Sequence, residues 1–320
     1  MLIESSDKDV LVRFLDETQE LTSEGQKKTY IEFGSNQAII APDEETKERV
    51  PEALRTGLVL TVYQIKGLEF NNVLLYDFFV SSKSGNDWRV ITGYLNNLLD
   101  PNSKPDLPED LHADLSQFLS ARPRPLQFDA QKHRLLASEL KQLYTAITRA
   151  KEKVWIFDSS IERRAPVFEL LQVLQLVTRM RGDETGDELK QFIDIYSHFA
   201  QSSTPYEWRL KADEFLKKRD FNHAAQCYEK ALDPQMKDFC HAEMKLEKLL
   251  RASSNSKLAT LKYEDDLLNV ATVFLNIQIP RAINEANLCF VRANRNDLVA
   301  LIFEKFDRVI DFMLIHYFEL

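Results

Sequence analysis

Four short runs of consecutive apolar residues in the first half of the chain predict buried β-strands. Polar stretches of helix-forming composition lie between them, at residues 44–54 and 131–149. Strands that are buried on both faces read as continuous apolar runs, so this pattern favours an α/β fold with a parallel sheet covered by helices on both sides. The predicted strands are Gln37–Pro42, Leu58–Tyr63, Asn72–Phe79 and Lys153–Phe157.

Beyond residue 160 the apolar spacing changes to that of α-helices. Val167, Leu170, Leu171 and Leu174 follow one another at intervals of three, one and three residues, which places them on one helix face. We therefore predict an α/β domain over residues 1–160, a helical linker over 161–204 and an all-helical domain over 205–320. Residues 81–130 contain five prolines and few apolar clusters, and they are interpreted as a long loop or insertion within the first domain.

Residues 205–234 resemble one tetratricopeptide (TPR) unit, a pair of antiparallel helices. Its small residues would let the two helices approach closely, and its aromatic residues would fill the seam. No second clean copy follows, so neighbouring helices are expected to complete the stack. A peptide partner on these helices is one interpretation, and an ordinary packing hairpin is the other. The positions that match are Trp208, Ala212, Phe215, Phe221, Ala224, Tyr228, Ala231 and Pro234.

Composition narrows the functional classes. The net charge of −9 argues against a protein that binds nucleic acid mainly through charge. Cys227, Cys240 and Cys289 lack metal-binding spacing and are expected to be small buried side chains in a reducing compartment. The sequence contains no apolar run long enough to span a membrane. We therefore expect a soluble intracellular protein without a bound metal or membrane association.

Two segments carry candidate chemistry. In the first, TVYQIKGLEF, Gly67 follows a strand and permits a close backbone approach, and Glu69 precedes the next strand, at a sheet edge where α/β proteins bind ligands. In the second, ELKQLYTAITRAK, Arg149 ends a helix just before a strand and offers a rigid charged group suited to a phosphate. Either segment alone could be structural, the first as a turn and Arg149 as a complement to a helix C-terminus.

Together these segments resemble motifs V and VI of UvrD/Rep-type superfamily 1 helicases. The resemblance covers roughly residues 30–160 and implies the second RecA-like domain of that motor. With IEFGSNQAIIAP, VLLYDFF and RAPVF, the chain is closer still to TPR and ankyrin repeat-containing helicase-like proteins of the lupus brain antigen type.

The resemblance also implies residue roles. Arg149 would be the arginine finger that reaches the γ-phosphate of ATP, with Tyr144 supporting its helix. Gly67 and Glu69 would contact the nucleotide, the first near the phosphates and the second near the ribose. Thr61, Tyr63 and Lys66 would couple nucleotide state to a single-stranded nucleic acid, although these helicases usually have histidine where Tyr63 stands.

Half of the implied ATP site is absent from the sequence. No G-x-x-x-x-G-K-[ST] loop and no plausible Mg²⁺-binding Asp-Glu pair occur in it. ATP with Mg²⁺ would therefore bind only together with a Walker A domain in the same parent chain. Two hypotheses remain: an ATP-dependent motor half that is inactive alone, or a degenerate helicase-like scaffold with TPR helices that binds a protein partner.

Overall fold

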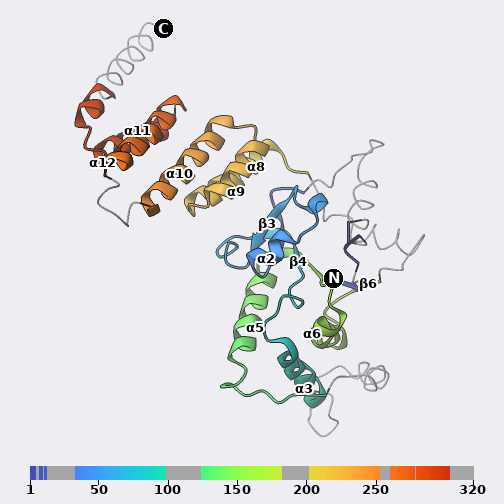
Figure 1. Ribbon diagram of the computed structural model, residues 1–320. Coiled ribbons are helices and arrows are strands. Elements are labelled where there is room, and N and C mark those ends of the chain that lie inside the picture. Colours follow the sequence, from blue (N-terminus) through green and yellow to red (C-terminus); the bar gives the residue numbers. More distant parts are fainter. Residues whose placement is uncertain are drawn as a thin grey trace. The chain divides into compact units, whose positions relative to one another are not determined.

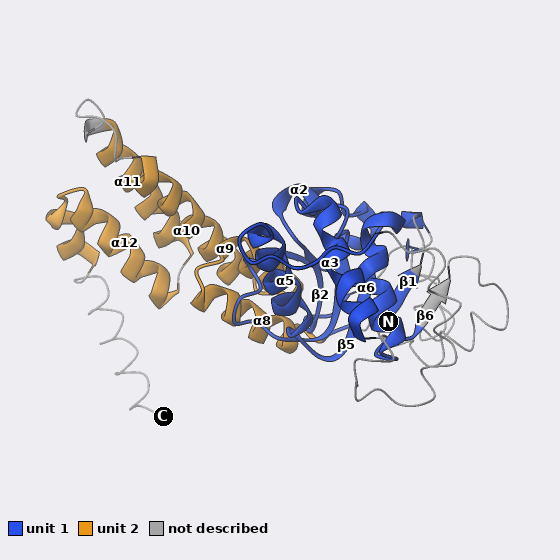
Figure 2. Ribbon diagram, turned by 90° about the horizontal axis from the view of Figure 1, so that it is seen from below, with its two compact units in different colours: residues 1–203 blue, residues 204–320 orange. Residues whose placement is uncertain are grey.

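The computed structural model describes residues 1–4, 7–9, 11–12, 33–98, 124–181, 202–252, 260–277 and 279–302. The chain divides into two compact units, residues 1–203 and residues 204–320 (Figures 1 and 2). The first unit combines a sheet with helices, and the described part of the second unit is helical. This is the α/β domain followed by a helical region that the sequence predicts.

A six-stranded parallel sheet forms the centre of the first unit, with the strand order β3-β2-β4-β5-β1-β6. All four predicted strands are confirmed, with ends shifted by a few residues. The two further strands contain only three residues each. The strands are β1 (Leu2–Glu4), β2 (Gln37–Ala41), β3 (Leu58–Thr61), β4 (Phe70–Tyr76), β5 (Ala150–Phe157) and β6 (Arg179–Arg181).

Burial explains the continuous apolar sequences of these strands, even at the edge of the sheet. Every residue of β2, and of the edge strand β3, is buried. Helix α2 (Glu44–Glu48) and the 3₁₀ turn η1 (Glu52–Leu54) follow β2, and α2 packs against β2 and β3. Helix α5 (Arg134–Ile147) packs against β4 and β5 and leads directly into β5.

Part of the segment predicted to be a long loop is helical. The 3₁₀ turn η2 (Gly85–Trp88) continues into helix α3 (Arg89–Leu98). Trp88 is buried, packs edge-on against Phe79 at 5.1 Å and donates its indole hydrogen to Ser82 Oγ at 2.7 Å. Anchoring of this kind is not apparent from a proline-rich sequence. Residues 99–123 of the predicted loop lie outside the described residues.

Helix α6 (Ile161–Val173) belongs to the first unit, although the sequence analysis assigned these residues to a linker. Ser160 caps its N-terminus by accepting a hydrogen bond from the Arg163 backbone. The helix packs on α3, where buried Leu95 contacts Val173. The first compact unit therefore extends past residue 160, as far as residue 203.

The second unit is a succession of antiparallel helices in which each packs on the next (Figure 2). The packed pairs are α8 with α9, α9 with α10, α10 with α11, and α11 with α12. Asp220 separates the two helices of the TPR-like hairpin as the N-cap of α9. All three cysteines are buried, as predicted. The helices are α8 (Pro205–Lys217), α9 (Phe221–Lys230), α10 (Pro234–Ala252), α11 (Thr260–Asn276) and α12 (Pro280–Arg292).

The same helix-ending turn recurs three times in this unit. Arg219, Leu232 and Asn294 each adopt a left-handed conformation with φ of 61°, 57° and 55°. After each of them, the next amide returns to the carbonyl of a buried aromatic residue, Phe215, Tyr228 or Phe290. This is the Schellman arrangement, which usually places glycine at the left-handed position. The turn is thus a repeated structural feature even where the TPR residue pattern is incomplete.

Within the described ranges, no helix combines the length and the apolar character that crossing a membrane requires.

We predict that Leu232→Gly stabilises the helical unit. Leu232 is 78% exposed and sits in the left-handed region, so glycine relieves backbone strain and removes little buried surface. The expected gain is about 0.5–1 kcal/mol, since a left-handed residue other than glycine costs about 1–2 kcal/mol and glycine loses part of that in chain entropy. Hydrogen exchange of the α9 and α10 amides measures it. Leu232→Ala, which keeps a Cβ atom, is the control and should give no gain.

Candidate nucleotide and nucleic-acid site

The turn between β3 and β4 carries the first candidate segment. It leaves β3 after Thr61 and enters β4 at Phe70. The Ile65 amide donates to the Thr61 carbonyl at 3.2 Å, and the Leu68 amide donates to the Ile65 carbonyl at 2.9 Å. Gly67 has φ of 71°, a left-handed conformation that glycine adopts readily. The K-G-L-E-F sequence thus forms a compact turn with a specific need for glycine.

Side chains of β3, the turn and α2 fix the start of this turn. The Thr61 amide donates to Gln64 Oε1 at 2.8 Å, and Lys47 Nζ donates to the same oxygen at 3.2 Å. Gln64 Nε2 donates in turn to Glu44 Oε1 at 3.2 Å. Thr61 itself is buried, with 5% of its surface exposed. Thr61 therefore stabilises the start of the turn and presents little surface to a ligand.

Arg149 lies directly beside the K-G-L-E-F turn. It follows the C-cap of α5, and its Nε donates to the Thr145 carbonyl at 3.1 Å. Its Nη1 approaches the Leu68 carbonyl at 3.4 Å, and its own carbonyl accepts the Phe70 amide at 2.9 Å. The side chain is half-buried. Two candidate segments that are 81 residues apart in sequence therefore meet at one point.

Glu69 completes this cluster. It lies at the amino ends of the strands, whereas the sequence predicted the edge where α/β proteins bind ligands. It forms an ion pair with Lys151 at 3.0 Å, and both side chains are more than half exposed. Glu69 directly precedes β4, and Lys151 is the second residue of β5. Open α/β sheets usually bind ligands outside the carboxyl ends of their strands. Glu69 and Arg149 instead lie at the amino ends of β4 and β5. The predicted location of Glu69, at the ligand-binding edge of the sheet, is therefore wrong.

The aromatic candidates point to solvent. Tyr63 is 78% exposed, and the Lys66 ammonium lies 5.1 Å from the centre of its ring. Tyr144 is 70% exposed, so its ring is not packed in the core beneath the arginine's helix. Tyr63 and Lys66 together form an exposed aromatic and cationic surface, the kind that can stack on a base and attract a phosphate.

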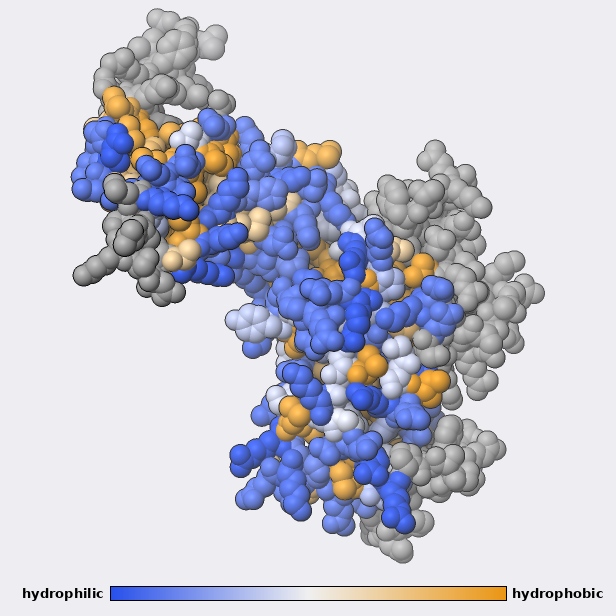
Figure 3. All heavy atoms as spheres, viewed as in Figure 1, coloured by the Kyte–Doolittle hydropathy of each residue, from blue (hydrophilic) through white to orange (hydrophobic). Residues whose placement is uncertain are grey.

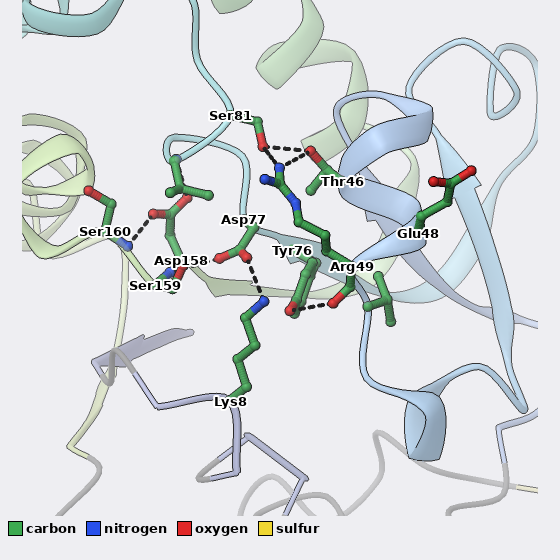
Figure 4. Close-up of polar contacts among 12 residues, drawn as sticks. Lys8, Thr46, Glu48, Arg49, Tyr76, Asp77, Ser81, Asp158, Ser159 and Ser160 are labelled. Carbon is green, nitrogen blue, oxygen red and sulfur yellow. Dashed lines mark hydrogen bonds and ion pairs between the residues drawn. The ribbon is translucent and has the colours of Figure 1, made fainter.

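The carboxyl ends of β4 and β5 carry two buried aspartates that the sequence analysis missed (Figure 4). Asp158 accepts hydrogen bonds from the backbone amides of Phe79, Val80 and Ser160, the latter two at 3.1 and 2.9 Å. Asp77 accepts from the Ser159 amide at 2.8 Å and pairs with Lys8 at 3.5 Å. The only sequence signal is an aspartate within the predicted strand Asn72–Phe79 and another directly after the predicted strand Lys153–Phe157.

These aspartates are structural. Burial raises the pKa of Asp158 to about 6, although the backbone hydrogen bonds favour its ionised form. A cleft of about 190 Å³ opens near them, but its walls contain none of the residues predicted to bind nucleotide or nucleic acid. The residues lining it are Pro42, Asp43, Phe78, Ser81, Ser82, Lys83, Leu135, Ser138, Glu139 and Gln142.

Comparison with known proteins supports a relationship to a repeat-containing protein. The chain is 40% identical over 205 residues to the human TPR and ankyrin repeat-containing protein 1. The matched region is 64% of this chain but only 7% of the length of that relative. No family model matches the sequence, and no solved structure is similar to it.

We predict that Asp158→Asn changes how the stability of the first unit depends on pH. The folded-state pKa is raised above 3.8, so the native state binds more protons and the carboxyl's stabilising contribution is lost as pH rises through about 6. The variant does not undergo this loss, so its free energy of unfolding relative to that of wild type should rise by about 2 kcal/mol from about pH 4 to pH 7. Hydrogen exchange in β4 and β5 measures the difference. Asp87→Asn is the control, and a pH-independent difference would show that Asp158 titrates normally.

We predict a second effect at the turn between β3 and β4. Gly67→Ala should destabilise the first unit by about 1–2 kcal/mol, because φ of 71° is strained for alanine. Gly85→Ala tests the same cause at a second position, because φ of 52° is strained for alanine although an added Cβ atom would meet no atom within 4 Å, and a similar loss is expected. Chemical denaturation followed by Trp88 and Trp155 fluorescence compares the two. A neutral Gly67→Ala would mean that the turn relaxes to another conformation.

Proposed function

We propose that the α/β unit is the second motor domain of a UvrD-like superfamily 1 helicase or translocase and supplies half of an interdomain ATP site. Arg149 is the arginine finger, while Gly67 and Glu69 contact the nucleotide. The other half, with the phosphate-binding loop and the Mg²⁺ ligands, comes from a Walker A domain of the same parent chain. The unit alone then binds ATP weakly and does not hydrolyse it.

The observation that carries this proposal is the contact between Arg149 and the Leu68 carbonyl. It brings a permanent cation, an exposed carboxylate and a glycine turn to one edge of the sheet. An arginine beside a phosphate stabilises the charge that develops in phosphoryl transfer. Gly67 is exposed, so a phosphate could approach the backbone closely. These groups suit a nucleotide whose remaining contacts come from an opposing domain.

In the same proposal, single-stranded nucleic acid is the second ligand of the motor. Tyr63 and Lys66 contact the strand, and Thr61 transmits the nucleotide state because it holds the start of the turn through Gln64. The exposure of Tyr63 and its proximity to Lys66 support this role. Stacking on an aromatic ring tolerates any base, so tyrosine in the place of histidine is compatible with strand binding.

The decisive experiment is ATP turnover by the parent chain with an intact Walker A domain. Arg149→Ala should reduce turnover by about 10³-fold or more, because an arginine finger contributes about 10³–10⁵ to the rate. Arg134→Ala is the matched control, since it removes an exposed arginine from the first position of the same helix. Unchanged turnover of Arg149→Ala, with the fold confirmed by circular dichroism, would exclude the finger assignment.

A second candidate function concerns the helical unit alone. Its succession of packed helices among the described residues, with a TPR-like first pair, suits a scaffold that binds a peptide partner. The human relative carries TPR in its name. This function requires no ATP, so Arg149→Ala should leave it intact, and the two candidates can be separated with one variant.

A further inference from the structure

The sheet of the first unit has a topological switch point between β2 and β4. These two strands are neighbours, but the chain continues from β2 to β3 on one side and from β4 to β5 on the other. In open α/β sheets, connections that part in this way leave a crevice outside the carboxyl ends of the two strands, and ligands bind there. The cleft of about 190 Å³ lies at this place, since its wall contains Asp43, which follows β2, and Phe78, which follows β4.

Side-chain hydrogen bonds fix the wall of this cleft, which we call the switch-point cleft. Glu139 of α5 is only 9% exposed, and it accepts hydrogen bonds from Ser82 Oγ at 2.6 Å and from the Lys83 amide at 2.8 Å. Toward α2, the hydroxyl of Ser81 bonds to that of Thr46 (Figure 4). Contacts of the folded unit therefore hold both the α5 side and the α2 side of the cleft in place, as is usual for small-molecule sites.

Several polar groups in the wall have bonding capacity left for a ligand. Asp43 Oδ1 accepts the Thr46 amide at 2.8 Å, and within the described ranges the Asp43 side chain takes part in no other hydrogen bond or ion pair. Ser138 and Gln142 stand one helical turn apart on α5, are exposed, and form no side-chain hydrogen bond with a described residue. Lys83 also lines the cleft and is exposed. The cleft thus offers a carboxylate oxygen, a hydroxyl, an amide and an ammonium group.

The composition of the wall selects the class of ligand. A volume of about 190 Å³ is smaller than the roughly 300–1,000 Å³ of sites for drug-sized ligands, so one small ring fits better than a whole nucleotide. Phe78, the aromatic residue of the wall, is only 2% exposed, which leaves little ring surface for a base to stack on. The carboxylates of Asp43 and Glu139 repel a phosphate but accept hydrogen bonds from hydroxyl groups. A sugar ring therefore matches the cleft best.

The switch-point cleft lies close to the exposed ring of Tyr63. Strands β2 and β3 end at paired residues, Ala41 and Thr61, and Asp43 and Tyr63 each stand two residues further on. Paired strands are only about 4.8 Å apart, so Asp43 and Tyr63 share the carboxyl edge of the sheet. On the face seen in Figure 3, the surface over α2 and α5 is mainly hydrophilic, with small separate hydrophobic patches. A nucleic-acid strand with a base stacked on Tyr63 can thus place a neighbouring sugar in the cleft.

We propose that the switch-point cleft binds the ribose of a single-stranded RNA, with Asp43 accepting a hydrogen bond from the 2′-hydroxyl. An acidic side chain binds a ribose hydroxyl in this way in dinucleotide-binding folds, and the 2′-hydroxyl is the group by which a protein tells RNA from DNA. The hydroxyl also accepts a hydrogen bond, for which Gln142 offers an amide donor, and Lys83 contacts a flanking phosphate. The inference rests on the proposed strand-binding function and names RNA as its substrate class.

The test measures binding of the full 320-residue chain to three fluorescein-labelled oligouridines of equal length. One is RNA, one is its 2′-deoxy form, and one is its 2′-O-methyl form, which keeps an oxygen at the 2′ position but cannot donate a hydrogen bond. Fluorescence anisotropy at low salt, where phosphate contacts are strongest, should show RNA bound at least about tenfold more tightly than either other form. The reason is that only RNA donates a hydrogen bond to a charged group in the cleft.

Variants locate the hydroxyl contact. Asp43→Asn keeps a side-chain oxygen for the N-cap of α2 but removes the carboxylate, and it should abolish the preference for RNA. Glu48→Gln makes the same chemical change at an exposed position of the same helix and should retain the preference. If Asp43→Asn does not fold, Gln142→Ala on the exposed side of α5 should weaken the preference in its place. Tyr63→Ala should weaken binding of RNA and DNA alike, because stacking does not depend on the sugar.

Four outcomes would overturn the inference. Equal binding of RNA and the deoxy form would do so while leaving strand binding through Tyr63 intact. Binding of the 2′-O-methyl form as tight as that of RNA, or a preference for RNA that survives Asp43→Asn, would show that the hydroxyl contact is absent. Displacement of labelled RNA by free uridine as effective as that by unlabelled RNA would make a nucleoside the occupant. Absence of saturable binding by all three oligomers would overturn the strand-binding proposal as well, so the two failures can be told apart.

Discussion

The parallel pairing of β4 with β5 determines what lies side by side at both edges of the sheet. Phe70 stands opposite Ala150 and Tyr76 opposite Phe157. At the amino edge this register brings Arg149 to the K-G-L-E-F turn and Glu69 to Lys151. At the carboxyl edge it allows Asp158 to hold the chain that leaves β4. A slip of one residue would turn every side chain of β5 to the other face and separate both sets.

The sequence predicted what depends on local composition and missed what depends on pairing. Continuous apolar runs predicted β2 to β5, because a strand that is buried on both faces has apolar residues at nearly every position. Strand β1 has three residues and is a strand because it adds to β5, which no local pattern reveals. The edge at which Glu69 lies depends on the direction of β4. Glu69 precedes this strand and therefore lies at its amino end, not at the ligand-binding edge that was predicted. The left-handed conformation of Gly67, by contrast, is a property of a single residue, of the kind that a glycine in a sequence can indicate.

Two buried carboxylates show how similar burial leads to different interpretations. Burial is the leading cause of the raised pKa in both Asp158 and Glu243. Asp158 accepts hydrogen bonds from three backbone amides, which partly offset its loss of hydration. These bonds connect the segment after β4 to the segment after β5. Glu243 accepts no such bond among the described residues, and the charges of Arg219 and Arg281 oppose its desolvation instead. Two carboxylates of similar burial are therefore compensated in different ways, one by backbone amides and the other by arginine charges.

The present contacts of Arg149 are compatible with the role of a finger. To reach a phosphate, its side chain would give up hydrogen bonds to the Thr145 carbonyl, the Leu68 carbonyl and the Thr148 hydroxyl. Three such bonds, exchanged for contacts with phosphate or water, cost about 2–4 kcal/mol in total. A rate contribution of about 10³–10⁵ corresponds to about 4–7 kcal/mol of transition-state stabilisation. The proposed gain exceeds the cost of release, so the resting contacts can position the arginine without preventing its movement.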